Sequence, residues 1–320
     1  MAYDGFVKKQ VESTCFFISI LLFFLYNKYI PNRKEENKMH IREKMAKIGK
    51  ETVTVTNLGF YYTPQNQNKR ISIKKELESS INGTILYTEE DTDDLLQRIQ
   101  PKQTYQTEFE VKNETTLQGA KRLKDEGFDK VFCLNFASAR NPGGGFLKGA
   151  IAQEESLARS SGLYPTLLEH EEMYEYNRAI KTGLYSDYMI YSPNVPVFRD
   201  DNGNFLEKPY CVSFLTSPAV NAGVVRKYND PNELNQIHSV MKTRIEKILA
   251  IALEQGYEAL VLGAFGAGVF KNDPQDVANY FHHILTKNPT FTNRFKKITF
   301  SVLDMTKERG TFIPFYNTFN

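Results

Sequence analysis

The sequence predicts an α/β protein of three layers, in which helices cover both faces of a central sheet. Two observations lead to this prediction: amphipathic segments alternate with short apolar runs, and a glycine-rich loop follows each of two apolar runs. Such alternation is typical of open α/β sheets, and continuous apolar runs are typical of strands buried on both faces. Both loops fall where these sheets bind ligands, at the carboxyl ends of strands.

The chain between Met39 and about Asn113 predicts an N-terminal accessory part. IREKMAKIGKET (41–52) indicates a helix, and TVTVT (52–56) and GTILYTE (83–89) indicate extended pieces. The polar stretch PQNQNKR (64–70) indicates a turn between those two extended pieces.

The first helix and strand pair of the main body follows. In residues 115–128, apolar side chains recur at helical spacing and Gly127 is a plausible stop. KVFCLNF (130–136) then indicates a buried strand. Farther along, residues 188–204 and 208–223 indicate extended segments around the turn DDNGN.

A second helix and strand unit lies near the C-terminus. An apolar stripe from Asn232 to Gly256 indicates a long helix, and EALVL (258–262) indicates the next strand. After the second glycine loop, Asp273 and Pro274 indicate the cap and first position of another helix. KKITFSVLD (296–304) indicates the last core strand, so a single domain over 39–320 is the simplest interpretation.

The N-terminal extension, residues 1–38, contains the apolar run CFFISILLFFLY (15–26). The run is shorter than the roughly 20 residues that a spanning helix needs, and no cleavage site of the signal-peptide kind follows it. Membrane association through residues 15–30, with the body on the cytoplasmic side, is one interpretation. The alternative is that translation begins at Met39, where the composition of a soluble protein resumes.

Composition excludes several classes of function. Lys and Arg number 40 against 38 Asp and Glu, so attraction to phosphate must come from a local site and duplex wrapping is disfavoured. The three cysteines are far apart, which predicts reduced thiols and no structural zinc. His282 and His283 are adjacent in a helical pattern, where neighbours point to different faces, so they are not expected to share a metal ion.

The first glycine loop, NPGGG, carries Gly143, Gly144 and Gly145. Without side chains these residues let the backbone approach a ligand and direct amides toward it, which suits a diphosphate. The second loop, GAFGAGVF, supplies Gly263, Gly266 and Gly268 in the same way. Neither loop continues into the Lys and Ser or Thr of a nucleotide triphosphatase, so ATP hydrolysis is disfavoured.

Gln153, Glu154 and Glu155 follow the first loop and precede the helix-like SLARSSGLY. Adjacent glutamates point in different directions, so one can orient a sugar while the other enters the reaction. A carboxyl in a partly dry pocket has a raised pKa and can protonate the leaving oxygen of a glycosidic bond. The alternative is a solvated helix start, where acidic residues are favoured by the helix dipole.

The GGG and QEE triplets, separated by residues 146–152, resemble the signature of poly(ADP-ribose) glycohydrolases, and residues 135–164 closely resemble its bacterial branch. The segments YSPNVPVFRDDNGNFL, SPAVNAG and GAFGAGVFKNDP are similar to family landmarks in the same order. The resemblance covers roughly residues 39–309. It implies a macrodomain fold with a mixed central sheet.

The resemblance also implies roles for individual residues. Glu155 matches the catalytic carboxyl, and Glu154 the residue that fixes the ribose hydroxyls. The two loops would hold the diphosphate, and Phe270 would pack over the ribose whose bond is cut. Either Asn141 or Asn135 would hold that ribose, with Asn141 favoured. The full set implied to meet the substrate is Gln153, Asn135, Asn141, Gly143, Gly144, Gly145, Gly266, Ala267, Gly268, Val269 and Phe270.

The implied activity is hydrolysis of the ribose–ribose bond in poly(ADP-ribose), with no metal or other cofactor, in a cytoplasmic protein that is expected to be a monomer. No sequence-specific contact with nucleic acid is expected. Two alternatives stay open at this point: a hydrolase of mono-ADP-ribose linkages on protein or nucleobase, and a macrodomain that binds ADP-ribose without cutting it. The retained glutamates argue against the second, since binding alone needs no carboxyl for proton transfer.

Overall fold

The computed structural model describes residues 33–63 and 66–320, with side chains from 40–63 and 69–320. Residues Met45–Asn320 form one compact unit. The hydrophobic run at 15–26 lies outside the described residues, and a domain boundary after residue 38 stays a prediction. Within the described ranges, no helix is both long enough and apolar enough to cross a membrane.

The elements follow the order α2 (Arg33–Leu58), β1 (Phe60–Thr63), β2 (Asn66–Ser72), α3 (Lys74–Asn82), β3 (Ile85–Tyr87), α4 (Glu89–Arg98), β4 (Glu108–Lys112), α5 (Thr116–Asp125), β5 (Val131–Phe136), the short 3₁₀ helix η1 (Phe146–Lys148), α6 (Gln153–Ser160), α7 (Leu163–Leu168), α8 (Glu172–Ala179), β6 (Met189–Arg199), β7 (Phe205–Ser217), α9 (Ala222–Tyr228), α10 (Pro231–Glu254), β8 (Ala259–Leu262), α11 (Pro274–Lys287), β9 (Lys297–Ser301) and α12 (Phe312–Phe319).

The central sheet is mixed, as predicted. Its seven strands run in the order β3-β6-β7-β5-β8-β9-β4. The β3–β6 and β6–β7 pairs are antiparallel, whereas β7–β5, β5–β8, β8–β9 and β9–β4 are parallel. The two strands that precede the glycine loops, β5 and β8, are therefore parallel neighbours, and both loops leave from the same edge.

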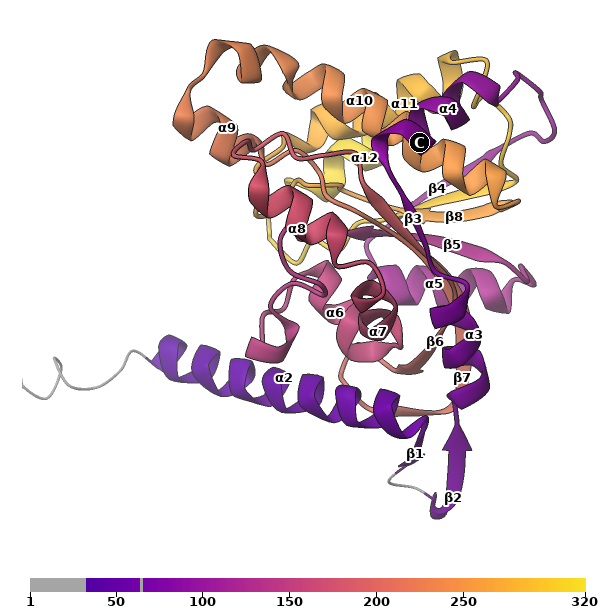
Figure 1. Cartoon of the computed structure of the whole chain (residues 1–320), viewed down its shortest axis with the longest axis vertical. Helices are drawn as coiled ribbons and strands as arrows, with labels where there is room; N and C mark the ends of the chain where they lie inside the picture. Colours follow the sequence, from indigo (N-terminus) through magenta and orange to yellow (C-terminus); the bar gives the residue numbers. More distant parts are fainter. Residues whose placement is uncertain (1–32, 64–65) are drawn as a thin grey trace, which may run out of the picture. The chain divides into compact units, whose positions relative to one another are not determined.

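Helices cover both faces of this sheet (Figure 1), which confirms the three-layer α/β/α prediction. On one face, α4, α10, α11 and α12 pack over a core to which β5 contributes Phe132 and Leu134. On the other face, α5, α6, α7 and α8 pack over a core to which β5 contributes Val131 and Cys133. Because alternate residues of a strand point to opposite faces, burial of both faces explains the continuous apolar run.

The predicted helix and strand units are confirmed. Helix α5 starts with a capping box between Thr115 and Gln118, and Gly127 follows it with φ +96°. Helix α10 begins at Pro231 behind its cap Asp230. Helix α11 begins at Pro274, and the side chain of Asp273 accepts hydrogen bonds from the first-turn amides.

Two local predictions are wrong. Residues 52–56, read as extended, belong to helix α2, and residues 66–70, read as a turn, belong to strand β2. Within the helix, Thr52 and Val55 are buried one turn apart, which is helical spacing. Thr52 Oγ1 donates to Arg159 O (2.6 Å) and accepts from Arg199 Nε (3.1 Å), so tertiary contacts override the strand preference of β-branched residues.

Candidate active site

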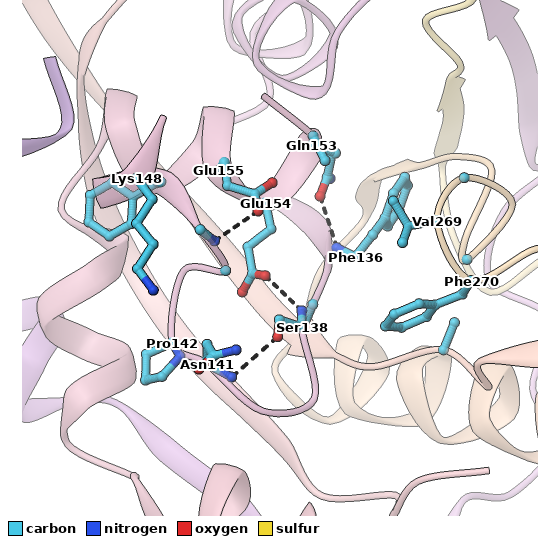
Figure 2. A pocket seen from close by; sticks show the side chains of 18 of the residues that line it. Phe136, Ser138, Asn141, Pro142, Lys148, Gln153, Glu154, Glu155, Val269 and Phe270 are labelled. Atoms are coloured by element: carbon cyan, nitrogen blue, oxygen red, sulfur yellow. Dashed lines mark hydrogen bonds between the residues drawn. The ribbon is translucent and has the colours of Figure 1, made fainter. Parts of the chain in front are cut away.

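The two glycine loops enclose a pocket of about 610 Å³. Its wall comes from the loop after β5, the first turn of α6 and the loop after β8. Figure 2 shows Glu154 and Glu155 on one side of this space and Val269 and Phe270 on the other. The arrangement confirms that the glycine loops, far apart in sequence, meet at one edge of the sheet.

The NPGGG loop requires glycine at Gly144. This residue has φ +60°, a conformation that side-chain-bearing residues avoid. A Cβ here would also overlap the Glu155 carboxylate and lie 3.0 Å from Glu154 Oε2. Glycine therefore allows the backbone to pass directly against both glutamates. Gly143 is also left-handed, at φ +65°, and lies against Phe146 and Ala158.

Helix α6 begins at Gln153, so the two glutamates lie in its first turn and not ahead of it. Gln153 attaches this turn to the end of β5: its Oε1 accepts from Phe136 N–H (2.9 Å), and its Nε2 donates to Leu134 O (2.8 Å). Nε2 also donates to Thr116 Oγ1 (3.0 Å). Gln153 thus fixes the position from which both glutamates extend.

Glu154 is a buried carboxyl with only 3 % of its surface exposed. Its Oε2 accepts from Ser138 N–H (2.7 Å), and its Oε1 lies 3.5 Å from Asn135 Nδ2. Burial, helped by the neighbouring charge of Glu155 and opposed by the Ser138 hydrogen bond, raises the pKa of Glu154 to about 8. The interpretation of a solvated helix start is therefore wrong for Glu154.

Glu155 points to a different partner from Glu154. Its Oε1 accepts a hydrogen bond from Gly145 N–H (2.9 Å), while its Oε2 bonds to none of the residues in the described ranges. Arg159, one turn later on α6, is buried, and its guanidinium donates to Ala150 O. Burial lowers the pKa of Arg159, and attraction to Glu155 opposes that change. The glycine loop thus holds one carboxylate oxygen of a residue that lines the pocket.

The second loop is packed just as closely. Gly266 has φ +74°, and a Cβ on it would lie 2.5 Å from the Cβ of Ala219. Asn272 Nδ2 donates to Gly266 O (3.1 Å) and to Val220 O (2.7 Å), which joins the loop to the chain after β7. Phe270 O accepts from Gly223 N–H (3.0 Å) at the start of α9. The backbone around Phe270 is therefore fixed from behind.

Most of the residues predicted from sequence line this pocket. They are Asn141, Gly144, Gly145, Gln153, Glu154, Glu155, Gly266, Gly268, Val269 and Phe270. Asn135, Gly143 and Ala267 do not line it. Asn135 is fully buried beneath the site, where its Nδ2 donates to Thr216 Oγ1 (3.0 Å), whereas Asn141 is exposed at the pocket. Contact of each residue with substrate stays a prediction.

Sequence reasoning missed Ser138, Phe136 and Ala219. Ser138 holds Glu154 through its backbone amide, and Phe136 and Ala219 line the pocket. Phe136 is the last residue of β5 and Ser138 follows it ahead of the glycines, positions that could have suggested a role. Ala219 carries no signal in its residue type, because its contact with Gly266 depends on how two distant loops pack.

A metal site would need a group of at least three His, Cys, Asp or Glu side chains. Across residues 33–63 and 66–320, no three such side chains are grouped so as to hold a metal ion. The ring centroid of His282, on α11, lies 5.6 Å from that of Phe319, on α12, in an edge-to-face contact. Cys133 and Cys211 are free thiols.

Comparison with known proteins gives the family. Residues 49–200 match the family model described as microbial-type PARG, catalytic domain, where PARG stands for poly(ADP-ribose) glycohydrolase. The crystal structure of poly(ADP-ribose) glycohydrolase from Thermomonospora curvata is 42 % identical, with a TM-score of 0.82, over 87 % of this chain and 100 % of that one. This chain belongs to the microbial-type poly(ADP-ribose) glycohydrolase family.

Two further glycohydrolase structures contain ligands. The T. curvata glycohydrolase bound to the inhibitor ADP-HPD is 43 % identical, with a TM-score of 0.80, over 86 % of this chain and 99 % of that one. The Deinococcus radiodurans glycohydrolase in complex with ADP-ribose is 40 % identical, with a TM-score of 0.71, over 76 % of this chain and 96 % of that one. No curated protein sequence matches the chain. The family membership confirms the resemblance seen in the sequence.

Proposed function

We propose that this protein hydrolyses the ribose–ribose O-glycosidic bond of poly(ADP-ribose) and releases ADP-ribose, with Glu155 as the group that transfers protons. One observation carries the assignment of Glu155. The glycine loop holds one oxygen of this carboxylate through Gly145 N–H at 2.9 Å, and the same residue lines the pocket. A hydrogen-bonded carboxyl at a pocket wall is a suitable general acid and base.

In the proposed reaction, protonated Glu155 donates to the oxygen that joins one ribose to the next. The bond between the anomeric carbon and that oxygen breaks, its electron pair stays on the oxygen, and the sugar passes through an oxocarbenium-like state. Water then attacks the same carbon and loses a proton to the Glu155 carboxylate, which restores the acid. A single carboxyl serves both steps, so the spacing rule for paired carboxylates in glycosidases does not apply.

The neighbouring residues are proposed to orient the sugar and the diphosphate. Glu154 is held from one side by Ser138 N–H and would accept hydrogen bonds from the ribose hydroxyls. Asn141 is proposed as the asparagine that meets this ribose, because it lines the pocket and Asn135 does not. The diphosphate would lie between the Gly143–Gly145 loop and the Gly266–Phe270 loop, whose left-handed glycines allow close approach.

The adenosine half of the substrate would extend into a neighbouring cavity of about 510 Å³. This cavity shares Gln153 and Gly268 with the first pocket, and Leu117 and Ala267 belong to its lining. A contact between Ala267 and the substrate would be made here. Polar and apolar groups both line the cavity, as is usual where a nucleoside binds.

The experiment compares the parent chain with Glu155→Gln on three substrates. Each protein is incubated with poly(ADP-ribose), with mono-ADP-ribosylated protein and with mono-ADP-ribosylated DNA, and free ADP-ribose is quantified. We expect release from the polymer by the parent and none by the variant. Release from a mono-ADP-ribosylated substrate alone would replace the polymer assignment, and binding of ADP-ribose with no release from any substrate would identify a non-catalytic macrodomain.

Membrane association through residues 15–30 and a monomeric state stay separate predictions. Fractionation of cells that express the full chain or a form starting at Met39 tests the first. Equal solubility of the two forms would end the anchor hypothesis. Light scattering of the purified chain tests the second.

A further inference from the structure

The segment between α8 and β6, residues 180–188, contains an aromatic residue in an unusual conformation. Tyr185 has φ +56°, in the left-handed region. Asparagine tolerates this region, but a bulky aromatic residue rarely adopts it. Such a conformation persists only where the surrounding structure imposes it, and strained residues of this kind gather near functional sites.

Arg244 of α10 binds the backbone around Tyr185. Its guanidinium donates to Tyr185 O (3.1 Å), to Leu184 O (3.0 Å) and to Pro218 O (3.0 Å). It also forms an ion pair with Asp187 at 2.7 Å. Arg244 is only 1 % exposed, and a buried charge is costly unless it is paired and hydrogen-bonded. Its contacts therefore join the segment around Tyr185 to the chain after β7.

Further hydrogen bonds fix the segment on either side of Tyr185. Ser186 N–H donates to Asn177 Oδ1 of α8 (2.9 Å), and Gly183 O accepts from Asn221 N–H (2.7 Å). Gly183, Leu184 and Ser186 are thus tied to the start of α9, to α10 and to α8, respectively. The direction in which the Tyr185 ring extends is set by the fold.

That ring packs against Phe270. The two ring centroids are 5.8 Å apart with an interplanar angle of 49°, within the range of favourable aromatic pairs. Phe270 lines the pocket, and Figure 2 shows its ring at the wall opposite the glutamates. Tyr185 does not line the pocket. Any effect of Tyr185 on the substrate must therefore act through Phe270.

We propose that Tyr185, held in a left-handed conformation by Arg244, is a positioning residue that fixes the ring of Phe270 at the ribose end of the pocket. The inference rests on the proposed function, in which Phe270 packs over the ribose whose bond is cut. A fixed ring contacts the sugar without first losing rotamer freedom, so the contribution is to substrate binding. Because this contact is made both before and during bond cleavage, it lowers KM and leaves kcat nearly unchanged.

The test uses two substitutions at Tyr185. Tyr185→Asn removes the ring and keeps a residue that tolerates the left-handed region, and Tyr185→Phe keeps the ring. We expect Tyr185→Asn to raise the KM for poly(ADP-ribose) and the Kd for ADP-ribose about tenfold, with kcat within a factor of two of the parent. Tyr185→Phe is expected to retain the parent values, and both variants to unfold within a few degrees of the parent.

A double-mutant cycle separates positioning from general packing. In a Phe270→Ala background, Tyr185→Asn is expected to cause no further change in the Kd for ADP-ribose, because the ring that it positions is absent. Parent values of KM and Kd in Tyr185→Asn would overturn the inference, and so would an equal loss in both backgrounds. If the parent releases no ADP-ribose from the polymer, the proposed function fails, and the Kd comparison still decides the role of Tyr185.

Discussion

The buried carboxyl of Glu154 leads to a measurable dependence of stability on pH. Burial, together with the smaller effect of the Glu155 charge, raises its pKa from the ordinary value of 4.5 to about 8. A glutamate of the unfolded chain keeps a pKa near its ordinary value. Because the folded pKa is the higher one, the contribution of Glu154 to stability is complete below about pH 4.5 and is lost as pH rises through about 8.

The magnitude follows from the two pKa values. A tenfold change in proton affinity corresponds to about 1.4 kcal/mol, so a rise from 4.5 to about 8 corresponds to an upper limit of about 5 kcal/mol. Glu154 is 3 % exposed, so screening by water reduces this value little. We expect a loss of several kcal/mol of unfolding free energy between pH 5 and pH 9 that originates at this residue.

Glu154→Gln isolates the effect. The amide keeps the shape of the side chain and an oxygen that can accept from Ser138 N–H, but it does not titrate. Urea unfolding at pH 5, 7 and 9 gives the unfolding free energy of parent and variant, and all other titrating groups are common to both. The variant is expected to gain about 3 to 5 kcal/mol relative to the parent between pH 5 and pH 9. Equal pH dependence of the two proteins would refute the argument.

Three further substitutions test other parts of the site and fold. Gly144→Ala would place a Cβ into the Glu155 carboxylate at φ +60°, and we expect steady-state kinetics to give a kcat more than about 100-fold lower. Gly310→Ala, where a Cβ meets nothing within 4 Å, is its control. Asn141→Ala is expected to raise the KM for poly(ADP-ribose) about fivefold or more without a change in melting temperature, which calorimetry checks. Thr52→Val keeps the side-chain volume but removes two buried hydrogen bonds, so urea unfolding is expected to give a free energy about 1 to 3 kcal/mol lower.

Local sequence patterns predicted the helices and strands around the site, because these elements begin and end at residues with strong conformational preferences. Asp273 with Pro274 marks the start of α11, and the apolar run of β5 marks a strand covered on both sides. The same reasoning failed at Thr52, because β-branched residues favour strands locally while packing against Arg159 and Arg199 favours the helix. Local propensity decides an element only where tertiary contacts do not oppose it.

The sequence predicted the chemical groups of the site but not the position of each side chain. The adjacency of Glu154 and Glu155 indicated two roles, but which carboxyl is buried depends on Ser138 and Gly145 folding back over α6. The sequence could also have decided between Asn135 and Asn141 as the residue expected to meet the ribose. Asn135 lies two residues after Cys133 on the same strand, so it shares that buried face. The role proposed for Tyr185 depends on contacts between segments far apart in sequence, so no local sequence pattern predicts it.

The central claim is that Glu155 transfers the protons of the reaction and is not needed to bind the substrate. The most direct measurement is a pair of values on one preparation of Glu155→Gln: the single-turnover rate of ADP-ribose release from poly(ADP-ribose) and the Kd for ADP-ribose by calorimetry. We predict a rate at least about 1000-fold below that of the parent with a Kd within a few-fold of the parent value. A variant that still releases ADP-ribose at a rate near that of the parent would contradict the claim.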